Sequence, residues 1–328
     1  MRKASTGAKR RRPETGLAGN ARSGHTSTLS MHWIVLSLTS ALFLGFYDLS
    51  QKHAVRDNAV LPLLFFSTLT GAAVWGGLLL AQAATPAAWP ALLRVAGLTP
   101  HQHLLLFVKS AIVASSWMFT YFAMKHLPIS LAAPIRATGP LWTLGGALVI
   151  LAERPTWLEG IGIATTLASF LGLSIAGRSE GVHFHRNKWV GFMLAGTLLG
   201  AVSTLYDKFL LGRVGFGAAT VQAWFSIYLF VLFTPLAIGW WRRWWPRNEF
   251  HWRWTIPLIA GLLLAADFAY FSALRDSAGL VSLVASLRRG STLVAFAGGL
   301  WLFGEKNGLR KLPAVLGVLA GIVLTALG

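Results

Sequence analysis

The stretch GLVSLVASLRRGSTLVAFAGGLWLFGE, residues 279–305, is apolar along nearly its whole length, yet it carries two adjacent arginines, Arg288 and Arg289. It is long enough for one α-helix to cross the hydrocarbon core of a bilayer. An arginine that faces lipid at that depth costs roughly 2.5–3.5 kcal/mol on insertion scales, and consecutive side chains on a helix point about 100° apart. We therefore predict that both arginines line a polar, water-accessible cavity inside a helix bundle.

The composition of the whole chain is that of a membrane protein. Of the 328 residues, 55% are hydrophobic and 12% are charged, whereas a soluble domain carries about 25% charged residues. The chain has no cysteine, which excludes disulfides and thiolate metal sites, and we predict no metal or other cofactor. The basic residues behind the net charge of +18 lie at the ends of apolar runs or in the first 30 residues, so we predict no nucleic-acid partner.

Ten apolar segments follow a basic N-terminal tail. Residues 1–30 hold seven Lys and Arg residues and one acid, which is typical of a disordered tail. Most of the later segments are long enough to span a bilayer, so we predict an all-α membrane protein with ten transmembrane helices. The segments are residues 31–50, 60–82, 104–124, 128–151, 156–176, 189–211, 218–240, 254–274, 278–303 and 311–327.

An internal repeat organises these segments. When the chain is shifted by 152 residues, eight of the 24 residues from 130 to 153 are identical to their counterparts, with Arg136 on Arg288 and Glu153 on Glu305. Segments one to five then pair with six to ten, and because five is odd, the second half crosses the membrane in the opposite sense. We predict two inverted five-helix repeats, residues 31–177 and 189–328, joined by the loop 178–188, with the binding site between them.

Basic side chains outnumber acidic ones inside and beside the apolar segments. A cavity lined in this way favours a carboxylate or a phosphate, because arginine offers a planar fork of donors and lysine a mobile point charge. The residues predicted to bind the substrate are Arg136, Arg288, Arg289, Lys208, Lys52, Tyr270 and Tyr121.

Two interpretations of the acidic residues remain open. Asp267 and Asp48 could couple transport to protons, because a carboxyl group buried among arginines responds strongly to its surroundings. They could instead form internal salt bridges that neutralise the arginines, and the polar residues would then stabilise the bundle rather than bind a ligand.

One sequence pattern occurs twice in the chain. The first copy, residues 121–163, is YFAMKHLPISLAAPIRATGPLWTLGGALVILAERPTWLEGIGI, and the second, residues 270–318, is YFSALRDSAGLVSLVASLRRGSTLVAFAGGLWLFGEKNGLRKLPAVLGV. The pattern resembles the drug/metabolite transporter superfamily, in particular its EamA-type members with ten helices. Pro140 and the pair Glu153-Arg154 match the family pattern in the first copy, and Glu305-Lys306 matches it in the second, which lacks the proline.

A more distant likeness is to the phosphate-sugar translocators of the same superfamily. It rests on the run Tyr206-Asp207-Lys208 and on the pair Arg288-Arg289, where those translocators have Lys-Arg. This likeness suggests a phosphorylated substrate. Membership of the superfamily implies secondary transport through a central cavity that opens alternately to each side, with both chain termini in the cytoplasm.

The sequence therefore predicts a multi-pass carrier of a small anionic metabolite in the bacterial inner membrane, and not an enzyme. Its expected partners are a small-molecule substrate and the lipid bilayer, and a homodimer is compatible with the sequence. Two alternatives remain open: an exporter of lipid phosphates or amino acids, and a receptor or scaffold that transports nothing. A scaffold would show no exchange of substrate across the membrane, which separates it from both carriers.

Overall fold

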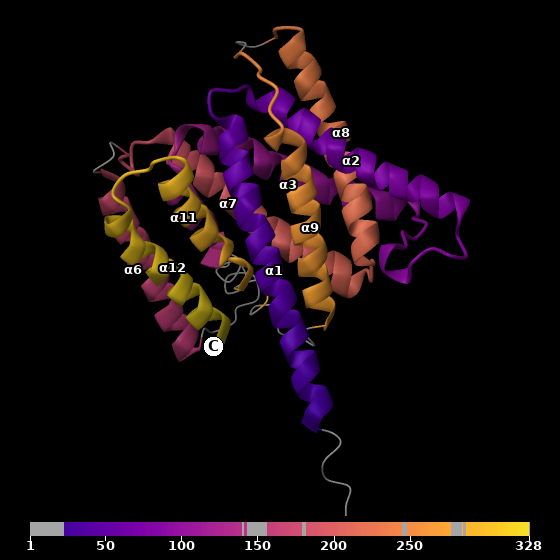
Figure 1. Cartoon of the computed structure of the whole chain (residues 1–328), viewed down its shortest axis with the longest axis horizontal. Helices are drawn as coiled ribbons and strands as arrows, with labels where there is room; N and C mark the ends of the chain where they lie inside the picture. The colour runs from indigo at the N-terminus through magenta and orange to yellow at the C-terminus, as the bar shows by residue number, and fades with distance from the viewer. Residues whose placement is uncertain are drawn as a thin grey trace, which may run out of the picture.

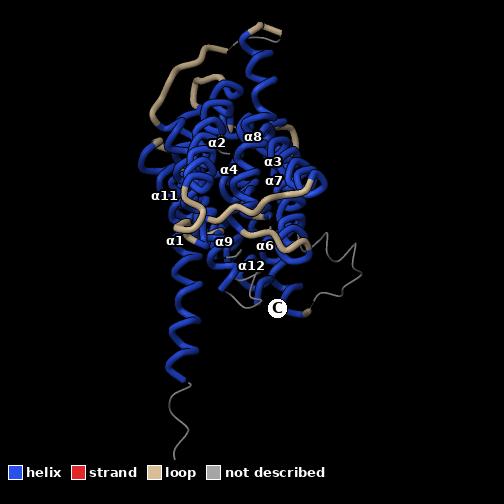
Figure 2. The backbone as a smooth tube through the Cα atoms, turned by 90° about the vertical axis from the view of Figure 1, so that its right-hand side faces the viewer, coloured by secondary structure: helices blue, strands red, loops and turns tan. Residues whose placement is uncertain are grey.

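The computed structural model describes residues 23–139, 141–142, 156–178, 182–244, 248–276, 284 and 287–327. These residues form ten α-helices, one 3₁₀ turn and one π-helical turn, and they contain no strand (Figures 1 and 2). The elements are α1 (Ser23–Val55), α2 (Val60–Ala84), η1 (Ala91–Leu93), α3 (Pro100–His126), α4 (Ile129–Ala137), α6 (Trp157–Arg178), α7 (Lys188–Lys208), η2 (Phe209–Arg213), α8 (Ala218–Trp241), α9 (Thr255–Asp276), α11 (Ser291–Leu302) and α12 (Gly308–Leu327).

Seven of the described helices are long and apolar enough to cross a membrane, and α6 and α11 contain shorter apolar stretches. Helices suit the hydrocarbon core of a membrane because each backbone N–H and C=O forms its hydrogen bond within the same segment. The predicted all-α class is confirmed. The predicted segments 128–151 and 278–303 are described only in part, as α4 and α11 with a few flanking residues.

The first helix begins earlier than the sequence predicted. The basic tail was expected to extend to residue 30, but α1 already begins at Ser23, while residues 1–22 lie outside the described residues. Extending an existing helix costs far less than nucleating one, so a helix set by its apolar span can continue into polar sequence. The start of α1 projects beyond the bundle, toward the same end as Leu327 (Figure 1).

The helices pack in pairs that come from opposite halves of the chain. α1 lies against α9, α3 against α7, α2 against α8 and α6 against α12. In Figure 1, α1 and α9 cross the centre of the molecule, α6, α11 and α12 form one flank, and α2 and α8 lie on the other. The two halves are therefore interleaved, and a residue from one half faces residues from the other across the middle of the bundle.

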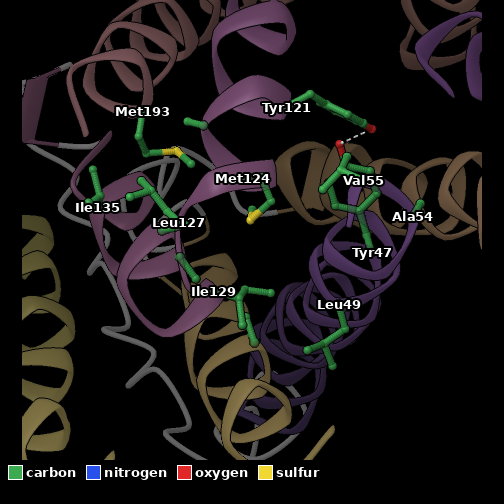
Figure 3. Packing of buried hydrophobic residues seen from close by; sticks show 14 of the residues in the cluster. Tyr47, Leu49, Ala54, Val55, Tyr121, Met124, Leu127, Ile129, Ile135 and Met193 are labelled. Atoms are coloured by element: carbon green, nitrogen blue, oxygen red, sulfur yellow. Dashed lines mark hydrogen bonds between the residues drawn. The ribbon is translucent and has the colours of Figure 1, made fainter. Parts of the chain in front are cut away.

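The largest buried apolar cluster occupies this middle region. Figure 3 shows part of it, with Tyr47 from α1 beside Tyr121 from α3, and with Met124, Leu127 and Ile129 around the short connection between α3 and α4. Tyr121, Met124 and Ile129 are 0% exposed. This packing fixes the start of α4 and hence the position of the arginine at its other end.

The contact between α3 and α7 needs a glycine. A Cβ atom on Gly196 would lie 2.4 Å from Oγ1 of Thr120 and 3.0 Å from the carbonyl oxygen of Ser116, so no larger residue fits. The hydroxyl of Ser116 donates a hydrogen bond of 2.7 Å to the carbonyl oxygen of Gly196, which joins the two helices directly. Small residues allow membrane helices to approach closely in this way.

Candidate functional site: a cavity lined by arginines

A cavity of about 210 Å³ lies between α1, α3, α4, α7 and the turn before α11. All three arginines that the sequence singled out line it: Arg136, Arg288 and Arg289. Tyr47, Trp117 and Tyr121 supply aromatic walls, and glycine, serine, threonine and a few small or aliphatic residues of α1, α3 and α7 form the rest of the lining. The structure therefore brings together residues that are more than 150 positions apart in the chain.

The twin arginines do not sit in the middle of a continuous helix. The sequence suggested one helix across residues 279–305, but the chain turns at Arg289 and Gly290, and α11 begins at Ser291. The amide of Gly290 donates to the carbonyl oxygen of Leu287 at 2.9 Å, and a Cβ atom on Gly290 would lie 3.0 Å from that same oxygen, so glycine allows the tight turn. Irregular backbone is tolerated at membrane depth where it lines a cavity.

A matching break occurs in the first half. α4 ends at Ala137, and Thr138 follows with its amide 3.2 Å from the carbonyl oxygen of Ile135. The shift of 152 residues places Thr138 on Gly290, so each half interrupts its helix two residues after its matched arginine. Because the helix ends there, the arginine side chains reach the cavity instead of lipid.

Arg136 is paired with a carboxylate from its own half. Its Nη1 donates to Oδ1 of Asp48 at 2.8 Å, and the Asp48 side chain is only 4% exposed. The same Nη1 also reaches Oε1 of Gln51 at 3.4 Å. Arg136 thus holds a buried acid that would otherwise be an isolated charge.

Arg288 is also paired within its own half. Its Nη2 forms an ion pair and hydrogen bond with Oδ1 of Asp267, and its guanidinium carbon lies 4.3 Å from the centre of the Tyr270 ring. Tyr270 therefore supports the arginine through a cation–π contact. It is not among the residues that line the arginine cavity.

Arg289 differs from the other two arginines. No carboxylate among the described residues lies within ion-pair distance of it, and its Nε is buried without a hydrogen-bond partner. It lies against Gly139 from the other half, whose Cβ position is 3.2 Å from Arg289 Nη2. Of the three guanidinium groups in this cavity, Arg289 is the one with no acidic partner in the described part of the chain.

The comparisons with known proteins agree with this architecture. The model of the EamA-like transporter family matches residues 31–175. Residues 31–175 belong to the EamA-like transporter family. The resemblance drawn from the sequence is confirmed, and the chain is an integral, multi-pass membrane protein of the transporter type.

Solved structures share the fold of this EamA-like chain, and 21 of their chains match it. One of them, described only as "Crystal structure of protein", has a TM-score of 0.60 and 14% sequence identity, and the match covers 90% of this chain and 98% of that one. At this identity the likeness shows the fold alone. No curated protein sequence matches.

Two lysines predicted for the site of this EamA-like protein have other positions. Lys52 donates from Nζ to the carbonyl oxygens of Met124 and Leu127, at the end of α3, and does not line the cavity. A lysine there satisfies carbonyls that the helix end leaves unpaired. Lys208 ends α7, but its side chain lies outside the described residues.

Lys109, a buried cation in the apolar run of α3, was not predicted from the sequence. Its side chain is 5% exposed, it forms an ion pair with Asp207 of α7, and its Nζ lies 4.9 Å from the centre of the Phe225 ring. The signal was present, because a lone lysine inside the run FVKSAIV needs a buried partner as much as the arginines do.

A second cavity of about 530 Å³ lies toward the end of the bundle where α7 and α9 end. Asp207 and Tyr270 form part of its wall, so it approaches the arginine cavity from that side.

Groups of three or more His, Asp or Glu residues that could hold a metal ion are absent from the described ranges.

Proposed function

We propose that this chain is a secondary transporter that carries a small organic anion through the arginine cavity by alternating access. The observation that carries the proposal is Arg289, a cation without an acidic partner among the described residues, inside a cavity in the middle of a membrane bundle. Such a charge is costly in apolar surroundings unless an anion or water compensates it. A bound anion would supply both the missing charge and an acceptor for the buried Nε.

Two inverted repeats are supported by the way the helices pack. If the halves exchange, α1 takes the place of α7, α2 of α8 and α3 of α9. The contact between α1 and α9 then corresponds to the contact between α7 and α3. In the same way, the contact between α2 and α9 corresponds to the contact between α8 and α3. All four contacts are present in the structure. The family match, which covers five helical segments and ends at residue 175, also fits a five-helix unit. A site between inverted repeats is typical of alternating-access carriers.

Polar contacts between the halves support closure at the end away from the termini. Glu305 accepts hydrogen bonds from the amides of Ile129 at 2.6 Å and Ser130 at 2.9 Å, at the start of α4. The Nζ of Lys311 donates to the hydroxyl of Ser130 at 2.7 Å. The larger cavity lies at the opposite end, and this arrangement supports the proposal of a carrier that is closed on one side of its substrate site.

Asp48 and Asp267 keep their predicted role as candidates for proton coupling. Protonation of either carboxyl group would release the arginine that it holds and change the charge of the cavity by one. A ligand can drive the exchange of states only through unequal affinity for the two, and a change of cavity charge is one way to alter that affinity. We place the chain in the bacterial inner membrane.

Counterflow in liposomes tests the proposed function. The purified chain would be reconstituted with an unlabelled small carboxylate or phosphate ester inside, and the uptake of the labelled compound measured. We expect uptake above that of empty liposomes, and its loss in Arg289→Gln at equal protein content. A chain that inserts normally but exchanges no anion of either class would be a receptor or scaffold instead.

A further inference from the structure

We propose that the arginine cavity selects substrates with a single negative charge, bound through a planar carboxylate, over phosphate esters and dicarboxylates. This inference rests on the proposed function and adds the valence of the substrate. It follows from the balance of arginine and aspartate charges at the cavity, from the guanidinium N–H groups that have no hydrogen-bond partner, and from the size of the cavity.

The charges of the described cavity do not cancel. Three arginines line it, and two of them are paired with Asp48 and Asp267. The neighbouring Lys109 is itself paired with Asp207. One positive charge therefore remains, and one negative charge neutralises it. A dianion would leave one uncompensated negative charge in the middle of the bundle, where the dielectric constant is lower than in bulk water and such a charge is penalised.

The remaining charge is an addition to the repeated framework. Arg136 and Arg288 occupy matched positions in the two halves, and each is neutralised by an aspartate of its own half. The same shift places Arg289 on Ala137. The charges of Arg136 and Arg288 are thus compensated within the protein, whereas Arg289 is a charge that the matched position of the first half does not carry.

The unused donors suit a carboxylate. The Nε atoms of Arg288 and Arg289 are both buried and have no hydrogen-bond partner, and they belong to adjacent residues in one turn. A carboxylate has two oxygens in one plane, which match the planar donors of a guanidinium. A bound carboxylate would offer its two oxygens to the planar donors of Arg289, the guanidinium that has no acidic partner in the described part of the chain.

The cavity limits the size of the rest of the molecule. At about 210 Å³ it is smaller than the pockets of about 300–1,000 Å³ that hold drug-sized ligands. Its other walls are aromatic rings, small hydroxyl residues, glycines and a few aliphatic side chains rather than further charges. A short carbon skeleton with a hydroxyl group, carrying one carboxylate, fits these walls.

Thermal unfolding of the purified full-length chain tests the valence directly. The probes are lactate, malate, glycerol 3-phosphate and glycerol, each titrated to give an apparent dissociation constant from the shift in Tm. We expect lactate to bind at least about tenfold more tightly than malate or glycerol 3-phosphate, a clear difference of affinities. Arg289→Gln should lose the response to lactate, and Arg56→Gln, which removes an exposed arginine far from the cavity, should keep it.

Two further variants separate charge from geometry. Arg289→Lys keeps the charge but not the planar fork, so it should bind lactate more weakly and still prefer it to malate. Asp48→Asn adds one positive charge to the cavity, so it should shift the preference toward malate and glycerol 3-phosphate.

The outcomes that overturn the inference differ from those that overturn the proposed function. If malate or glycerol 3-phosphate binds wild-type protein as tightly as lactate does, the valence assignment is wrong and anion transport stands. If lactate binding survives in Arg289→Gln, the free charge is not the binding group. If glycerol alone shifts Tm, or if no probe does, both the inference and the proposed function fail.

Discussion

Arg289 occupies its position because the residue facing it has no side chain. The Cβ of an alanine at Gly139 would lie 3.2 Å from Arg289 Nη2, closer than an ordinary contact. We predict that Gly139→Ala displaces the guanidinium and weakens anion binding by about tenfold, or about 1.4 kcal/mol. The measurement is the shift in the Tm of the variant on addition of lactate, compared with the shift of the wild type.

Gly200→Ala is the matched control for this variant. Gly200 lines the same cavity, but its Cβ would meet only Ser116 Oγ at an ordinary 3.8 Å. We expect this variant to bind the anion as the wild type does. Equal weakening in both variants would show that crowding of the cavity, and not the position of Arg289, controls binding.

The pair Lys109 and Asp207 makes a separate residue-scale prediction. Lys109 is buried and Asp207 is 22% exposed in its side chain. Lys109→Met should lower the free energy of unfolding by about 1–3 kcal/mol, below the roughly 3–5 kcal/mol of a fully buried pair, because water reaches Asp207. The double variant Lys109→Met/Asp207→Leu should recover much of the loss, and a purely additive loss in thermal or chemical unfolding would contradict a coupled pair.

At the scale of elements, α4 depends on the other half of the chain for its N-terminal cap. Its N-cap residue, Pro128, makes no side-chain cap, and Glu305 supplies the acceptor instead. We predict that Glu305→Ala destabilises the protein by about 1–2 kcal/mol, the typical cost of a lost cap. It should also raise the labelling of a single cysteine placed at Leu127, which is 1% exposed and lies at the same end.

Glu159→Ala is the control for this effect. Glu159 caps its own helix, α6, through a reciprocal pair of hydrogen bonds with Thr156, and both hydrogen bonds are exposed. Its loss should lower stability slightly and leave the labelling at Leu127 unchanged. Equal labelling in both variants would contradict a specific link between Glu305 and closure.

The elements also show what the sequence could and could not predict. Apolar length located the helices, and the cost of burying arginine correctly predicted that Arg136, Arg288 and Arg289 line a cavity. The turn at Arg289 and Gly290 was missed, because one turn interrupts a helix without lowering its hydropathy. The pairing of each arginine with Asp48 or Asp267 was left open, because it depends on which helices pack together, and sequence spacing alone does not fix that.

At the scale of the whole molecule, the proposed alternating access requires the bundle to open at the end where α1 ends and α9 begins. Nδ1 of His53 and Oγ1 of Thr255 lie 3.3 Å apart across the two halves at that end. Since the chain has no cysteine of its own, we predict that His53→Cys/Thr255→Cys forms a disulfide that stops counterflow and that a reductant restores it. Each single variant is the control, and wild-type flux with the disulfide formed would contradict alternating access at this end.

The matched positions that follow the framework arginines have a consequence for how such carriers evolve. Residues 137 and 289 are equivalent under the repeat, and here one is alanine and the other arginine. Ala137 packs with Val318 and Ile322 and does not line the cavity, so it is a substitution of Arg289 by an uncharged residue that would change the charge of the cavity by one unit, while leaving the Arg136–Asp48 and Arg288–Asp267 pairs intact. Under the proposed function, a single mutation at position 289 would therefore change the charge of the substrate that the cavity binds, while both arginine–aspartate pairs stay in place.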